Sequence, residues 1–174
     1  MRYRGPLSPD QAAAFWRLGV LTGDDVSRLA MQWLEEGANS PTVASLAGQR
    51  GVILSDCRAD FEKGLRELGA AASLSKREAA WRFVRTLLIA VKEGALAPLD
   101  AAHEVVTLER TGIGLFPLRN LAPDGKPYAG EELGIEMMLG LYWTLDDVDA
   151  SDTEIAEATA ELRVECLRVL ELFY

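Results

Sequence analysis

The chain has 174 residues, of which 49% are hydrophobic and 26% are charged, and its formal net charge is −9. This length suits one folded domain, residues 1–174, with enough apolar residues for a sizeable core. The sequence contains no run of the roughly 18 apolar residues that a membrane span needs, and its first residues lack the apolar segment of a signal peptide. We therefore expect a cytoplasmic protein without a membrane partner.

Charge is distributed unevenly along the sequence. Residues 1–90 carry twelve basic and ten acidic side chains, whereas residues 91–174 carry six basic and seventeen acidic ones. The two halves therefore have net charges of +2 and −11. Such an asymmetry indicates a surface with one sign of potential, which favours a basic partner and argues against binding to nucleic acid.

Helix signals recur from the N-terminus onward. Ser-Pro pairs at 8–9 and 40–41, together with Thr22, are typical helix starts, and a glycine follows each apolar run. These signals predict four helices in the first seventy residues, the last of which begins at Ser55-Asp56. The glycines that are expected to end them are Gly19, Gly37, Gly48 and Gly69.

The stretch 75–93 is the most apolar helical pattern in the chain. Ser75 and Glu78 are spaced as a capping box, and Gly94 is a typical left-handed stop. Two adjacent apolar stripes cover more than half of this helix, so we expect other helices to pack on several of its sides. The stripes consist of Ala80, Phe83, Leu87 and Ala90, and of Trp81, Val84, Leu88 and Val91.

The rest of the chain continues the helical pattern. Residues 98–110 predict a helix with Leu99 among its inward residues, and 112–127 is a long irregular segment. Residues 131–145 predict another helix, and a second capping box at 151–154 opens the last one. No stretch alternates as a strand would. The sequence therefore predicts an all-α fold, a bundle of about seven or eight helices around the central apolar helix.

One part of the sequence resembles small uncharacterised helical proteins of high-GC bacteria. The pattern consists of the segments 33–37, 40–41 and 46–48, followed by Phe61, Leu65 and 67–69, within about residues 28–110. Its members are helix caps and core residues. Some of these proteins are similar to immunity proteins of bacterial toxin systems, so the resemblance implies a toxin-neutralising role and assigns no functional residue.

Residues with catalytic or metal-binding chemistry are few. His103 is the only histidine, and it lacks the further His or Cys of a structural zinc site. Cys57 and Cys166 are too few for a disulfide framework; one bridge between them is the alternative to two reduced, packed cysteines. Neither 112–114 nor 147–152 completes a phosphate or calcium loop. We expect no catalytic residue, no metal and no cofactor.

The strongest surface feature of the sequence is acidic. Four glutamates fall at i, i+3, i+7 and i+11 of the last helix, and four aspartates stand just before it or at its start. We expect them on the side opposite apolar residues such as Ile155 and Leu162. The predicted partner-binding residues are Asp146, Asp147, Asp149, Asp152, Glu154, Glu157, Glu161 and Glu165. Plain solvation of an amphipathic helix is the alternative interpretation.

These patterns favour binding over catalysis. We expect a protein-binding module, specifically an inhibitor or immunity-type protein, whose acidic face occupies the cationic surface of a basic protein partner. One alternative is a structural homo-oligomer. The other is an enzyme whose site uses carboxylates among Glu104, Glu109, Glu131, Glu132 and Glu136.

Overall fold

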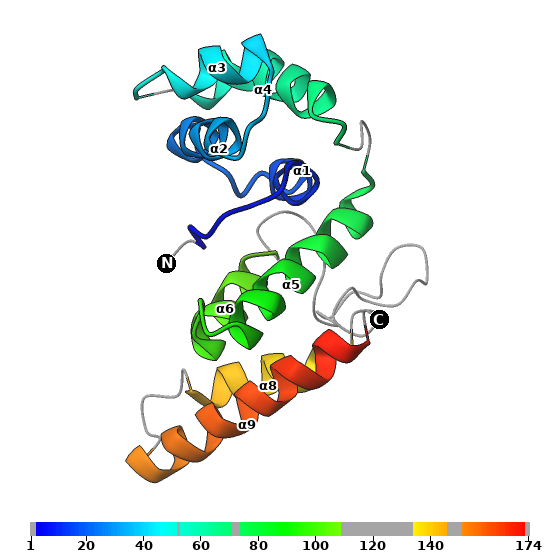
Figure 1. Cartoon of the computed structure of the whole chain (residues 1–174). Helices are drawn as coiled ribbons and strands as arrows, with labels where there is room; N and C mark the ends of the chain where they lie inside the picture. The colour runs from blue at the N-terminus through cyan, green and yellow to red at the C-terminus, as the bar shows by residue number, and fades with distance from the viewer. Residues whose placement is uncertain (1–2, 52, 71–73, 109–133, 146–150, 173–174) are drawn as a thin grey trace. The chain divides into compact units, whose positions relative to one another are not determined.

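The structure is a computed structural model, and it describes residues 3–51, 53–70, 74–108, 134–145 and 151–172. Eight α-helices and no strand are present within these ranges, which confirms the predicted all-α fold (Figure 1). The chain divides into two compact units, Arg4–Phe83 and Val84–Tyr174 with Met1–Tyr3. The division falls inside helix α5 (Lys76–Lys92). The single domain expected over residues 1–174 stays a prediction.

Four helices precede α5 in the first unit: α1 (Pro9–Arg17), α2 (Gly23–Glu35), α3 (Pro41–Ala47) and α4 (Leu54–Glu67). The contacts between them join α2 to α3, α4 to both, and α1 to α4. The predicted caps Ser8, Thr22 and Ser40 each accept a hydrogen bond from the backbone three residues on. The start of α4 differs from the prediction, because Ile53 is its N-cap and makes no side-chain cap bond.

Aromatic side chains join the helices of the first unit. The ring of Phe61 in α4 has its centroid 4.8 Å from that of Trp16 in α1 and 6.0 Å from that of Trp33 in α2. Phe15 of α1 packs on Phe83 of α5 with a centroid distance of 4.7 Å. All of these rings except that of Trp16 are buried. Burial of large apolar rings from different helices therefore holds this unit together.

Helices α3 and α4 are joined by one carboxylate and one glycine. The Glu67 carboxylate accepts hydrogen bonds from Ser40 Oγ at 2.5 Å and from Thr42 Oγ1 at 3.1 Å. The bond from Ser40 is the main reason that the pKa of Glu67 lies below its usual value. A Cβ at Gly64 would stand 3.2 Å from Val43 Cγ2, so glycine permits the close approach of the two helices.

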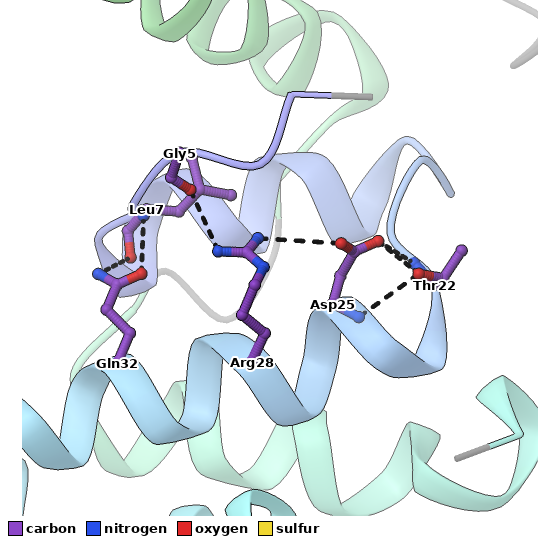
Figure 2. A network of polar contacts seen from close by, with 6 residues as sticks. All are labelled: Gly5, Leu7, Thr22, Asp25, Arg28 and Gln32. Atoms are coloured by element: carbon purple, nitrogen blue, oxygen red, sulfur yellow. Dashed lines mark hydrogen bonds and ion pairs between the residues drawn. The ribbon is translucent and has the colours of Figure 1, made fainter. Parts of the chain in front are cut away.

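Polar side chains of α2 hold the segment that precedes α1 (Figure 2). The Gln32 amide donates to the Leu7 carbonyl and accepts from the Leu7 N–H, both at 3.2 Å. Arg28 donates to the carbonyl of Gly5 at 3.3 Å and forms an ion pair with Asp25 at 3.8 Å. These contacts satisfy backbone groups beside the buried Leu7 side chain, so the segment is fixed on α2.

The second unit contains the rest of α5 with α6 (Pro98–Val106), α8 (Glu136–Leu145) and α9 (Asp152–Glu171), and the last three contact one another pairwise. Both apolar stripes of α5 are buried except at Trp81, which is half-buried at the edge of that face. The Ser75–Glu78 capping box and the left-handed Gly94 are confirmed. None of the described helices is long and apolar enough to cross a membrane.

The inward position predicted for Leu99 is wrong. The buried face of α6 is centred on Ala101 and Val105, which lie one turn apart. Leu99 stands two residues before Ala101 and therefore points to the other side of the helix, where it is 40% exposed.

Candidate interaction surface on helix α9

Helix α9 begins with the capping box that its sequence predicts. The Glu154 carboxylate accepts hydrogen bonds from the Ser151 N–H at 2.8 Å and from Ser151 Oγ at 2.7 Å, while Ser151 Oγ accepts from the Glu154 N–H at 3.4 Å. These bonds, the side-chain one first, hold the pKa of Glu154 below its usual value. Glu154 is therefore an exposed, ionised carboxylate in the first turn, where the helix dipole favours it.

The inner face of α9 packs against α6 and against α8, which runs antiparallel to it. Cys166 Sγ lies 3.7 Å from Met138 Sδ, and Arg168 donates to the carbonyl of Gly134 at 3.0 Å. Helix α9 has twenty residues and α8 has ten, so the first turns of α9 extend past α8 (Figure 1). The buried residues of α9 are Ala158, Leu162, Glu165, Cys166, Val169 and Leu170.

Glu165 corrects the prediction of an exposed acidic stripe opposite the apolar side. It is only 8% exposed, and its carboxylate accepts two hydrogen bonds from Arg168, at 2.6 and 2.7 Å. Its neighbours on the helix surface are Leu162, three residues before it, and Val169, four residues after it, and both are buried. The stripe therefore lies beside the buried face of α9, and Glu165 is its one member at the edge of that face.

The other three glutamates of the stripe are exposed, and so is Asp152, which stands two residues before Glu154 and therefore on another side of the helix. We call these four exposed carboxylates the acidic row: Asp152, Glu154, Glu157 and Glu161. No Lys or Arg stands three or four residues from any of them in the sequence. Arg163 lies two residues from Glu161 and so on another side of the helix, and Arg168 is held by Glu165. Ion pairs to the row are absent among the described residues. Asp146, Asp147 and Asp149 lie outside the described residues.

Apolar side chains are also exposed on α9, and sequence reasoning missed them. We call them the outer seam: Ala156, Ala160, Val164 and Leu167, of which Val164 is 68% exposed and Leu167 half-buried. The available signal was their spacing at i, i+4, i+8 and i+11. An amphipathic pattern predicts one apolar side for a helix, whereas α9 has two.

His103 occupies a structural position in the second unit. Its side chain is exposed, and Nδ1 lies 2.9 Å from the hydroxyl of the buried Tyr142, which links α6 to α8. No group of three or more His, Cys, Asp or Glu side chains that could hold a metal ion occurs in the described part of the chain. His103 therefore gives no indication of a metal centre.

Both cysteines are free and buried. Burial raises the pKa of the Cys166 thiol to about 12, and it is also the main cause of the raised pKa of Cys57. A raised pKa favours the protonated thiol, so burial works against a nucleophilic role for either side chain. Cys57 and Cys166 do not form the disulfide bridge that was the alternative to two reduced cysteines.

The structure describes two of the five carboxylates of the alternative enzyme hypothesis. Glu104 is buried on α6, whereas Glu136 is exposed on α8. Glu109, Glu131 and Glu132 lie outside the described residues.

Comparisons with protein-family models, with curated proteins and with solved structures found no match to this chain. The resemblance to helical proteins of high-GC bacteria therefore stays a prediction, as does the immunity-type role that it implies. The surface of α9 is the feature of the molecule on which a functional proposal can rest.

Proposed function

We propose that this protein acts by binding a basic protein through the acidic row of α9. The observation that carries the proposal is that no described Lys or Arg side chain forms an ion pair with the acidic row. Four exposed carboxylates follow one another over ten residues, and the nearby guanidinium of Arg168 is bonded to Glu165 instead. Like charges at helical spacing cost a helix about 0.2–0.5 kcal/mol per pair, and a cationic surface would reverse that cost.

Electrostatic attraction of this kind acts mainly on encounter. A surface with one sign of charge steers an oppositely charged partner, raises the association rate and makes that rate depend on salt. The unit that contains α9 also carries the whole net charge of the chain, because Arg2 and Arg85 reduce the −11 of residues 91–174 to −9 and residues 4–83 sum to zero. The negative charge of the whole unit therefore adds to the attraction that the acidic row exerts on a basic partner.

The specific form of the proposal is an inhibitor or immunity-type protein. A nuclease or similar toxin binds phosphates in a cationic groove, and a row of carboxylates is a chemical substitute for those phosphates. The competing proposal of a carboxylate enzyme has two described side chains, the buried Glu104 and the exposed Glu136, which differ in burial.

The test compares two double charge reversals of equal net charge. Glu157→Lys/Glu161→Lys alters the acidic row, and Glu35→Lys/Asp60→Lys alters exposed carboxylates of the first unit as a control. Association with the partner recovered from the native cell is measured at two ionic strengths. We expect the first pair to slow association about tenfold at low salt and to flatten its salt dependence, and the control to do so far less. Unchanged rates at both salts would reduce the row to a solvated helix face.

A further inference from the structure

Helix α9 is apolar on two opposite sides. Val164 stands two residues from the buried Leu162 and two from the buried Cys166, yet it is 68% exposed. A step of two residues turns an α-helix by about 200°, so Val164 faces away from the buried side. The rest of the outer seam lies in line with it at helical spacing, and Ala156 and Ala160 are also exposed.

We propose that the basic partner binds the outer seam as an amphipathic α-helix, with its apolar side on Ala160 and Val164 and its lysines or arginines beside Glu157 and Glu161. This inference rests on the proposed function, because it specifies the form in which the basic partner is recognised. The seam covers residues 156–167, a length of about 16 Å or three helical turns. A repeat of three to four residues matches the ridges of a second helix over that whole length.

The sizes of the seam residues suit close helix packing. Ala156 and Ala160 project little, so a neighbouring backbone can approach them, whereas Val164 projects farther and can enter the gap between side chains of the partner. Helices that pack in this way have axes about 8–10 Å apart. Val164 is exposed in the chain alone, so a partner helix that covers it would remove apolar surface from water and thereby stabilise the complex.

Charge beside the seam identifies the chemistry of the partner. Glu157 stands three residues before Ala160, and Glu161 stands three before Val164, so a carboxylate borders the seam in successive turns. Lys and Arg side chains meet both requirements at once, because their stems cover apolar surface while their charged ends reach the carboxylates. A basic amphipathic helix is therefore complementary to this side of α9 in both charge and polarity.

A second copy of this chain does not have that complementarity. Helix α9 carries six acidic and two basic residues, and one of the two, Arg168, is held by Glu165. Pairing two such helices through their outer seams would bring two acidic surfaces together, with only Arg163 on each helix to set against the four carboxylates of the acidic row. The observations thus favour a basic partner over self-association.

The experiment uses the full chain and two synthetic lysine-rich peptides of identical composition, each about five helical turns long. One has its leucines on a single helical side, and the other has them distributed around the helix. We expect the first to bind at least about tenfold more tightly in calorimetry and to gain helicity in circular dichroism on binding. Equal affinities without added helicity would overturn the inference.

Val164→Glu separates apolar packing from charge. It adds a negative charge, so binding by charge alone would become tighter, whereas helix packing on the seam predicts binding about tenfold weaker. Ala160→Gln is a second seam variant with no charge change and should also weaken binding. Met31→Glu, at an exposed methionine of α2, is the matched control and should leave affinity within about twofold.

The two proposals fail differently. If both peptides bind equally, and Glu157→Gln/Glu161→Gln weakens both while Val164→Glu does not, the acidic row binds cations without recognising a helix. In that case the further inference is wrong and the proposed function stands. If Glu157→Gln/Glu161→Gln leaves the affinity of both peptides unchanged, the acidic row is not a binding surface and both proposals fail.

Discussion

The Glu165 carboxylate and the Arg168 guanidinium of α9 form a two-bonded ion pair, with Oε1 2.6 Å from Nη2 and Oε2 2.7 Å from Nε. The glutamate side chain is 10% exposed and the arginine side chain 49% exposed. The same guanidinium reaches the carbonyl of Gly134 before α8. One arginine thus neutralises the buried carboxylate, joins two elements and is withdrawn from the acidic row.

Removal of this arginine should destabilise the fold. Arg168→Ala leaves the Glu165 carboxylate without its cation near the buried face, so we expect a loss of about 2 kcal/mol in the free energy of unfolding. Arg163→Ala, also exposed on α9, is the control and should stay within about 0.5 kcal/mol. Denaturant melts of both variants give the comparison, and equal losses would contradict the structural role assigned to the pair.

Truncation of Phe83 should lower the stability of the fold more than truncation of most other residues. It is 1% exposed and packs on Phe15, so Phe83→Ala should lower the free energy of unfolding by about 3–5 kcal/mol. The neighbouring Arg82 makes a 3.3 Å ion pair with Asp10 between largely exposed side chains, and Arg82→Ala should cost at most about 1 kcal/mol. If urea melts show a larger loss of unfolding free energy for Arg82→Ala than for Phe83→Ala, the assigned faces of α5 are wrong.

Glu67 should contribute to the loss of stability in acid. Its pKa in the folded chain is lower than the ordinary value of 4.5, because Ser40 and Thr42 donate to its ionised form. Its contribution is therefore fully present above that ordinary value and is lost as the pH falls through the lower folded-state value.

The measurement compares urea unfolding of the wild type and of Glu67→Gln from about pH 6 to about pH 3. The stability difference between them should shrink as the pH falls. The control Glu35→Gln replaces an exposed carboxylate of α2 and should show a nearly constant difference. A difference for Glu67→Gln that does not change with pH would rule out this source of acid sensitivity.

The two thiols should be protected in the folded protein. Both are buried, and burial raises the pKa of Cys166 to about 12, which disfavours its reactive thiolate form. We expect an aromatic disulfide reagent to titrate two thiols after unfolding and to react at least about a hundredfold more slowly before it. Rapid reaction of either thiol in the native protein would mean that its burial is wrong.

The sequence alone was sufficient for the local features of the fold. The capping boxes at Ser75–Glu78 and Ser151–Glu154 and the glycine stop at Gly94 are confirmed. Each of these depends on contacts between residues at most four positions apart, so the residue types and their spacing determine them without tertiary structure. The same holds for the exposure of Glu157 and Glu161, whose neighbours one turn away are mostly polar or small.

Tertiary structure decided which side of each helix is covered. Glu165 repeats the spacing of the acidic row but lies at a buried edge, because α6 and α8 pack against that side of α9. Leu99 is as apolar as its neighbours but is exposed, because the packed face of α6 is centred on Ala101. The periodicity of a sequence indicates that a helix has an apolar side. It does not indicate how much of the helix surface becomes buried or whether a second apolar side stays exposed, because both depend on contacts with residues distant in sequence.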